Sequence, residues 1–265
     1  GKKVIAVAGT HGKTTTTALI AFMLHRAGLS PTIMIGGESI DLGANALPGE
    51  GDYFVVEADE YDRAFLNYHP YIAVVTNLEP DHLDIYGGFE ELKATFRQFL
   101  SQVDSNGYVI ACQDSPALQA ILPPTVGDDM HSNPVHVVSY GLSPESGFLA
   151  KNIQQKGIDT STFMVEFRKQ VWGVLETQLP GVHNVLNSLG AVAVGHAIGL
   201  DREAISSAVA EFRGVRRRFE FVGEASGIGT LVRWAWRPGF FRSPSPGRVG
   251  RVGFRSERPA LIVAR

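Results

Sequence analysis

The segment that most constrains the fold is a short apolar run that leads into Gly9-Thr10-His11-Gly12-Lys13-Thr14 and then into a helical stretch. Residues 3–8 are continuously apolar apart from Lys3, which is typical of a strand buried in a parallel sheet. Residues 14–27 follow with helix-forming residues, and Gly28 fits a helix C-terminal cap. A strand, a glycine-containing loop and a helix in this order are typical of an open α/β sheet.

The loop has the chemistry needed to bind phosphate. A helix N-terminus offers unpaired N–H groups and the positive end of the helix dipole, and glycines let the backbone approach an anion closely. The Lys13 ammonium can contact β- and γ-phosphates, and the Thr14 hydroxyl can ligate Mg²⁺. Val7 stands where the full G-x-x-x-x-G-K-[ST] pattern has its first glycine. The residues predicted to bind the nucleotide phosphates are Gly9, Thr10, His11, Gly12, Lys13, Thr14 and Thr15.

Strand and helix patterns alternate along most of the chain. We therefore predict an α/β fold, a doubly wound, mostly parallel sheet of the P-loop type. Short alternating runs in residues 148–179 predict a small antiparallel β extension, and residues 183–198 and 201–212 predict a helical pair. The remaining predicted strands are 32–35, 53–58, 72–76, 108–112 and 135–139, and the remaining predicted helices are 89–103 and 115–121.

Acidic residues follow two of these strands. Glu57, Asp59, Glu60 and Asp62 come at the end of one apolar run, and Asp81-His82 follow the end of another. Because ligands lie beyond the carboxyl ends of strands in such sheets, a carboxylate here can hold the metal that bridges nucleotide phosphates. We predict this function for Glu57, whereas the other three carboxylates fit a solvated loop equally well. For Asp81-His82 we predict a second metal site or a substrate-orienting site.

Composition excludes several other classes of protein. The net charge of −3 gives no sign of nucleic acid or an anionic membrane as a partner. The single cysteine, Cys112, excludes a disulfide framework within the chain and fits a cytoplasmic location. No apolar run reaches the roughly 18 residues of a membrane span. The chain begins directly on a strand without Met or a signal peptide, which we interpret as a fragment cut near a domain boundary.

The last segment, residues 229–265, differs from the rest. It contains eight arginines, no lysine and a single acid, Glu257, and it shows no sustained period. A basic segment with tryptophans could bind nucleic acid. Its composition favours an out-of-frame or mis-joined terminus, so we expect an irregular, disordered tail after a domain that comprises residues 1–228.

Five segments together carry a resemblance to a known family. Residues 9–17, 57–66, 76–86, 181–189 and 216–220 resemble, in that order, the motifs of the central ATPase domain of the Mur ligases. The loop alone would suit the whole superfamily, including folylpolyglutamate synthetase. His11 and the segments Glu-Ala-Asp-Glu and Asp-His-Leu-Asp narrow the resemblance to the alanine-adding members and the murein tripeptide recycling ligases.

The resemblance implies roles for individual residues. Lys13 would contact the β- and γ-phosphates, Thr14 and Glu57 would ligate one Mg²⁺, and His82 would approach a second. Near the adenine would lie Asn184 and Asn187, although these residues could equally form a helix start. Arg217 or Arg218 would face phosphate. The residues that the resemblance implies for catalysis are Lys13, Glu57 and His82.

The implied activity is ATP-dependent ligation in peptidoglycan precursor synthesis. UDP-N-acetylmuramate would be activated as an acyl-phosphate, and L-alanine would then form the amide. Family members also carry an N-terminal domain for the UDP end of the substrate and a C-terminal domain for the amino acid, so we expect an isolated central domain. The alternatives are an inactive ATP-binding remnant, the recycling ligase, or an unrelated P-loop NTPase or kinase. The sequence leaves the oligomeric state open.

Overall fold

The computed structural model describes residues 1–81, 85–122, 135–156 and 159–216, together with the backbone of 218–225, 228–233 and 262–264. The strands of the main sheet are β1 (Lys3–Ala8), β2 (Thr32–Ser39), β3 (Ala44–Leu47), β4 (Tyr53–Glu57), β5 (Ile72–Val75), β6 (Tyr108–Cys112), β7 (His136–Gly141), β8 (Phe148–Lys156), β9 (Thr160–Phe167) and β10 (Gln170–Thr177). The helices are α1 (Lys13–Arg26), α2 (Phe89–Ser101), α3 (Pro116–Gln119), α4 (Val182–Ala197) and α5 (Arg202–Glu211), with a 3₁₀ helix η1 (Tyr61–Asn67).

These strands form one mixed, ten-stranded sheet in the order β10-β9-β8-β7-β6-β5-β1-β4-β2-β3. Strand β1 lies at its centre and pairs in parallel with β4 on one side and β5 on the other. The register sets Val7 beside Glu57 and Ala8 beside Val75. The chain therefore leaves these three neighbouring strands at the same edge of the sheet, and this edge carries the candidate site described below.

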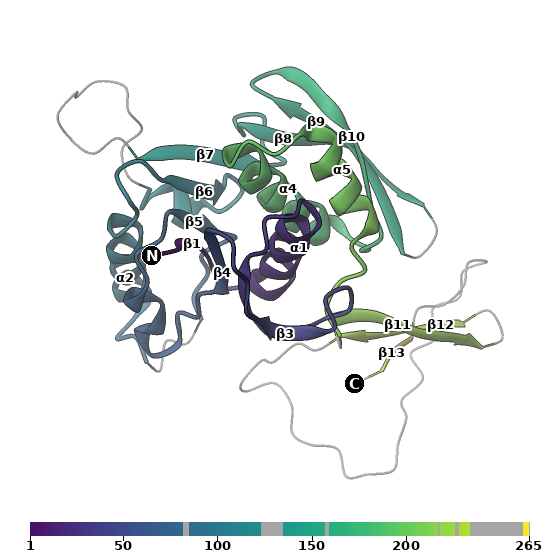
Figure 1. Ribbon diagram of the computed structural model, residues 1–265, viewed down its shortest axis with the longest axis horizontal. Coiled ribbons are helices and arrows are strands. Elements are labelled where there is room, and N and C mark those ends of the chain that lie inside the picture. Colours follow the sequence, from purple (N-terminus) through teal and green to yellow (C-terminus); the bar gives the residue numbers. More distant parts are fainter. Residues whose placement is uncertain are drawn as a thin grey trace, which may run out of the picture.

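Helices cover both faces of the sheet. Helices α1, α4 and α5 pack against one another on one side, and α2 lies on the other side (Figure 1). Helix α1 is buried around most of its circumference because it lies between the sheet and α4. Helix α2 instead has a single apolar face, on which Phe96 and Phe99 are fully buried. This two-faced arrangement confirms the predicted doubly wound α/β sheet.

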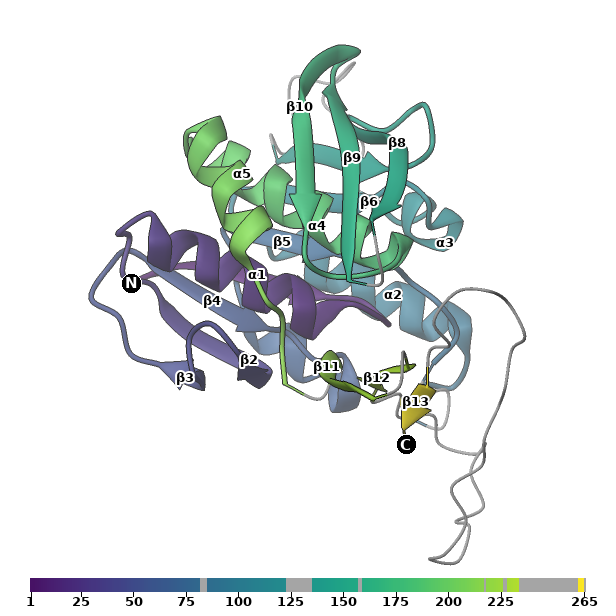
Figure 2. The same cartoon turned by 90° about the vertical axis from the view of Figure 1, so that its right-hand side faces the viewer.

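The predicted antiparallel extension is also present, and it continues the main sheet. Strand β8 pairs in parallel with β7 at Tyr140 and Phe148, and β9 and β10 then add antiparallel strands. Figure 2 shows β8, β9 and β10 side by side beyond the parallel strands. Stacking of Phe148 on Phe167, with ring centroids 4.3 Å apart, joins β8 to β9.

The structure differs from the sequence-based prediction in three places. Strand β3 and η1 were not predicted, because residues 44–47 are half-exposed without alternation and a 3₁₀ turn has no apolar period. Residues 229–233 and 262–264, in the segment expected to be irregular, lie in β12 (Ile228–Arg233) and β13 (Ile262–Ala264). With β11 (Arg218–Ala225) they form a separate three-stranded sheet, in which pairing to β11 and β12 supplies hydrogen bonds that local sequence does not reveal.

No helix among the described residues is both long enough and apolar enough to cross a lipid bilayer.

Candidate nucleotide-binding site

The loop between β1 and α1 depends on two glycines. Gly9 has φ +124° and Gly12 has φ +85°, values that side chains with a Cβ atom rarely adopt. A Cβ on Gly9 would lie 2.3 Å from Thr76 Oγ1, and a Cβ on Gly12 would lie 2.4 Å from Asn187 Oδ1. The loop is therefore closely packed between the end of β5 and the start of α4.

The residues after β5 hold the loop in place. The His11 N–H donates to Asn77 Oδ1 at 2.8 Å, and the Thr10 N–H donates to the Asn77 carbonyl oxygen at 3.2 Å. The Glu79 N–H donates to Thr10 Oγ1 at 3.0 Å. The part that Asn77 and Glu79 play in holding the loop was not predicted from the sequence. The sequence nevertheless gave an indication of a role for Asn77. This residue directly follows the predicted strand 72–76, which ends at the same edge of the sheet as the strand before the loop.

The N-terminus of α1 opens directly from the loop. No side chain caps it, so the N–H groups of its first turn keep their capacity to bind an anion. Thr14 is buried and Thr15 is half-buried within this turn. An uncapped helix N-terminus next to a tightly curled glycine loop is the arrangement that phosphate binding requires.

Lys13 lies over the loop and is paired with Glu60. Its ammonium donates to both carboxylate oxygens of Glu60, at 2.9 Å each, and to the Gly9 carbonyl oxygen at 2.8 Å. The side chains are 13% and 3% exposed, respectively. Burial raises the pKa of the Glu60 carboxyl, and the neighbouring Lys13 opposes this shift. From the sequence, a place in a solvated loop and a functional role had been equally consistent with Glu60.

Two oxygen ligands suited to Mg²⁺ lie side by side at the end of β4. Thr14 Oγ1 donates to Glu57 Oε1 at 2.8 Å, and the Gly36 N–H donates to Glu57 Oε2 at 2.7 Å. Gly36 leaves room for this carboxylate, because a Cβ there would lie 2.5 Å from Glu57 Oε2. Hydroxyl and carboxylate oxygens are the ligands that Mg²⁺ prefers, so this pair fits the ion.

The start of α4 meets the same loop. Asn187 accepts a hydrogen bond from the Thr16 hydroxyl at 3.3 Å and donates to Asn184 Oδ1 at 3.0 Å. Asn184 in turn donates to the Pro180 carbonyl oxygen at 2.8 Å. Both asparagines are buried. The structure thus brings these two residues, which were selected from the sequence, next to the phosphate loop.

The structure does not describe the side chains of three residues that were selected from the sequence. His82 and Arg217 lie outside the described residues, and the backbone alone of Arg218 is described, at the start of β11. Asp81, before the first of these gaps, is half-buried. The roles inferred for His82, Arg217 and Arg218 therefore stay predictions.

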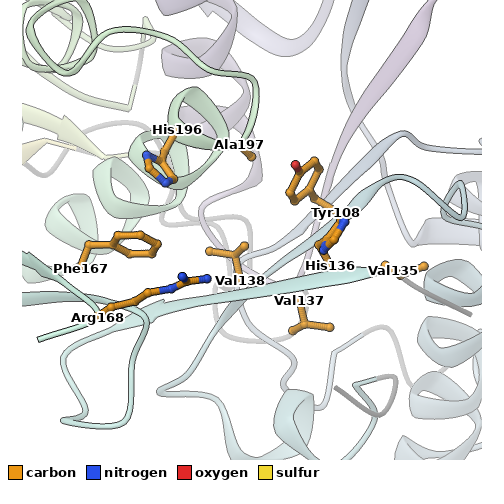
Figure 3. A pocket seen from close by; sticks show the side chains of 9 residues that line it. All are labelled: Tyr108, Val135, His136, Val137, Val138, Phe167, Arg168, His196 and Ala197. Carbon is orange, nitrogen blue, oxygen red and sulfur yellow. The ribbon is translucent and has the colours of Figure 1, made fainter. Parts of the chain in front are cut away.

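A hollow of about 400 Å³ lies away from this site (Figure 3). Tyr108 and His136 in its wall begin β6 and β7, whereas the loop follows the end of β1. His196, at the C-terminal end of α4, also faces it. The hollow is thus at the opposite edge of the sheet from the loop between β1 and α1. The complete lining is Tyr108, Val135, His136, Val137, Val138, Phe167, Arg168, His196 and Ala197.

Comparison with known proteins gives consistent results. Residues 7–195 match the family model described as the Mur ligase middle domain. The chain is 42% identical over 234 residues to UDP-N-acetylmuramate–L-alanine ligase of Salinibacter ruber, covering 88% of this chain and 47% of that protein. It therefore spans about half the length of this curated relative.

Two solved structures share the fold and part of the sequence. UDP-N-acetylmuramate-alanine ligase MurC of Thermotoga maritima superposes with a TM-score of 0.74 at 29% identity, over 88% of this chain and 51% of that one. UDP-N-acetylmuramate:L-alanyl-γ-D-glutamyl-meso-diaminopimelate ligase of Neisseria meningitides gives a TM-score of 0.70 at 30% identity, over 82% of this chain and 68% of that one.

Proposed function

The chain belongs to the Mur ligase middle domain family, and from this premise we propose that it is the ATP-binding part of a ligase joining L-alanine to UDP-N-acetylmuramate. The observation that carries the proposal is the phosphate loop. Gly9 and Gly12 shape it, the uncapped N-terminus of α1 opens from it, and Lys13 lies over it. The proposed setting is peptidoglycan precursor synthesis in the cytoplasm, and thus cell-wall formation, cell shape and cell division.

Each part of the site has a task in this proposal. The loop N–H groups and Lys13 bind the nucleotide phosphates and neutralise their charge. Thr14 and Glu57 hold Mg²⁺, which when bound offsets negative charge on the transferring phosphoryl group. We propose that His82 approaches a second Mg²⁺, that Asn184 and Asn187 lie beside the adenine, and that Arg217 or Arg218 faces phosphate. His11 and Thr10, anchored by Asn77, keep the loop in the conformation that receives the nucleotide.

The proposed reaction has two steps. A carboxylate oxygen of UDP-N-acetylmuramate attacks the γ-phosphorus of ATP, and ADP leaves. The amine of L-alanine then attacks the acyl carbon, the amide forms and inorganic phosphate leaves. A carboxylate is a poor electrophile, and phosphorylation gives it a usable leaving group. Because the protein itself forms no covalent bond, its contribution is positioning and charge neutralisation.

A second candidate is a ligase that acts on a murein tripeptide. It is supported by the 30% identity and the TM-score of 0.70 to the Neisseria ligase named for the L-alanyl-γ-D-glutamyl-meso-diaminopimelate peptide. An assay that supplies UDP-N-acetylmuramate with either L-alanine or the tripeptide, and measures phosphate release, separates the two. Nucleotide binding without phosphate release from either pair would instead support an inactive remnant.

Removal of Lys13 tests the nucleotide site. We expect Lys13→Ala to lower the affinity for Mg·ATP about tenfold to a hundredfold, since a hydrogen bond to a charged group contributes ~1.5–3 kcal/mol. Titration calorimetry with Mg·ATP on the full chain measures this. Lys2→Ala, an exposed lysine at the start of the chain, is the matched control and should bind like the wild type. Unchanged binding by Lys13→Ala would remove the assignment, as would wild-type protein that is folded but does not bind Mg·ATP.

A further inference from the structure

Glu60 is a buried carboxylate whose relation to the nucleotide is not explained by the proposed function. The Glu60 carboxylate accepts hydrogen bonds from the Lys13 ammonium, the group that the nucleotide phosphates would also bind. Resting on the proposed function, we propose that Glu60 is a further residue of the nucleotide site: its carboxylate holds the Lys13 ammonium, and the β- and γ-phosphates of the nucleotide compete with Glu60 for that ammonium.

The contacts of Lys13 use its full hydrogen-bond capacity. A lysine ammonium has three N–H donors. Two of them go to Glu60 Oε1 and Oε2, and the third goes to the Gly9 carbonyl oxygen. All three are thus occupied by the protein itself. A phosphate oxygen can gain a hydrogen bond from Lys13 only by taking it from one of these acceptors.

The backbone of Glu60 is anchored, whereas Lys13 carries its ammonium on a long flexible stem. The Glu60 carbonyl oxygen accepts hydrogen bonds from the Tyr86 hydroxyl and from the Arg63 N–H, the latter at 3.0 Å. Phe65 then anchors η1 in the core, stacked on Phe99 at 4.8 Å. The four-carbon stem of Lys13 allows its ammonium to turn towards a ligand. We therefore infer that Lys13, rather than Glu60, turns when a nucleotide binds.

The ion pair between Lys13 and Glu60 lies largely out of contact with solvent. Lys13 is 13% exposed and Glu60 is 3% exposed, so this ion pair is poorly screened. The Asp59 carboxylate lies near Glu60, and the neutral Tyr86 hydroxyl is a neighbour of Glu60 that also faces Arg63, Asp59 and Asp62. When Lys13 leaves, Glu60 becomes a buried carboxylate without its cation, which is costly. Nucleotide binding must offset this cost, so Glu60 weakens the affinity of the wild-type site.

The test is the substitution Glu60→Gln in the full chain, with binding of Mg·ATP, Mg·ADP and AMP measured by calorimetry or by displacement of a fluorescent ADP. Glutamine keeps the shape but removes the competing charge. We expect Mg·ATP and Mg·ADP to bind about tenfold more tightly or better, the size of one charge-assisted hydrogen bond. AMP has neither a β- nor a γ-phosphate, and its affinity should stay within about twofold of the wild type.

The matched control is Asp62→Asn. It makes the same change in charge two residues away, on an exposed side chain at φ +51°, a backbone conformation that asparagine tolerates. We expect less than about twofold change in Mg·ATP affinity. A merely structural role of Glu60 would weaken nucleotide binding or leave it unchanged, so a gain confined to β/γ-phosphate ligands separates the two roles.

The outcomes are distinct. Unchanged or weaker Mg·ATP binding by Glu60→Gln, or equal tightening of AMP binding, overturns the inference while the proposed function stands. A folded wild-type chain that does not bind Mg·ATP overturns the proposed function and the inference together. If thermal melting shows that Glu60→Gln does not fold, Glu60→Asp takes its place. Its carboxylate is one methylene further from Lys13, and it should tighten Mg·ATP binding in the same direction by a smaller factor.

Discussion

At the scale of single residues, the site depends on two glycines that allow the loop backbone to approach neighbouring polar side chains closely. Gly9 lies against Thr76, and Gly12 lies against Asn187. The first approach brings the loop onto the end of β5, and the second brings it onto the start of α4. A glycine in the loop thus serves two purposes, since it permits a positive φ and leaves room for a neighbouring polar group.

Substitution of Gly12, compared with substitution of Gly28, separates the effect of the positive φ from the effect of the close approach to a polar group. Gly12→Ala places a Cβ at φ +85° and 2.4 Å from Asn187 Oδ1, so we expect it to abolish detectable Mg·ATP binding and to cost ~1–3 kcal/mol of backbone strain. Gly28→Ala is the control, because Gly28 has φ +74° with open space around the Cβ position. It should lose a similar amount of stability and bind Mg·ATP normally. Urea unfolding and calorimetry measure both quantities; equal nucleotide affinity of the two variants would contradict this account.

At the scale of elements, parallel pairing of β1 with β4 and β5 assembles the site. The chain leaves these strands at one edge, so the phosphate loop, Glu57 and Asn77 become neighbours although they are far apart in sequence. The short 3₁₀ helix η1 adds Glu60 to this edge. Asp62 and Arg63 interrupt η1 with non-helical φ and ψ angles, so its position depends on Phe65, which is fully buried against α2.

This dependence predicts the effect of Phe65→Ala. Loss of a fully buried ring that stacks on Phe99 and meets Phe96 edge-on, with centroids 5.0 Å apart, should cost ~3–5 kcal/mol in the free energy of unfolding. Tyr61→Ala, on the same helix but 51% exposed, is the control and should cost less than ~1 kcal/mol. Chemical denaturation followed by circular dichroism measures both. A loss below about 1 kcal/mol for Phe65→Ala would show that η1 does not rely on this contact.

At the scale of the whole molecule, all ten strands of the main sheet and the helices α1 to α5 precede the arginine-rich segment, residues 229–265. The buried hydrophobic cluster of the described residues extends along the chain to Val215. The ten-stranded sheet ends, in sequence, with β10, and α4 and α5 close one of its faces. The three-stranded sheet formed by β11, β12 and β13 is separate from it.

Because β12 and β13 belong to this separate sheet, we expect deletion of residues 229–265 to leave Mg·ATP affinity within about twofold and the melting temperature within a few degrees. Calorimetry and thermal melting of the shortened chain measure this. A chain cut before Arg202 is the control, because it also loses Ile205, Ala208 and Val209 of the core and should not fold stably. Loss of nucleotide binding on deletion of 229–265 would show that this segment belongs to the domain.

Local patterns in the sequence were enough to predict the architecture and to select several residues that the structure brings together, such as Thr14 and Glu57. Apolar runs and helical periods predicted the parallel strands, the long helices and the antiparallel extension, because burial imposes those periods directly. The loop from Gly9 to Thr14 was recognisable because its residues are consecutive. Strand β3 and η1 were missed because their positions depend on pairing to β2 and on packing against α2.

The sequence by itself determined which groups could bind a nucleotide: a glycine loop, a lysine, a threonine and a carboxylate at strand ends. Tertiary structure alone decided which of these groups touch. The contacts between Lys13 and Glu60, His11 and Asn77, and Thr16 and Asn187 join residues 47, 66 and 171 positions apart. No local pattern specifies such pairs, because they depend on strand register and helix packing, which bring distant segments to one edge of the sheet.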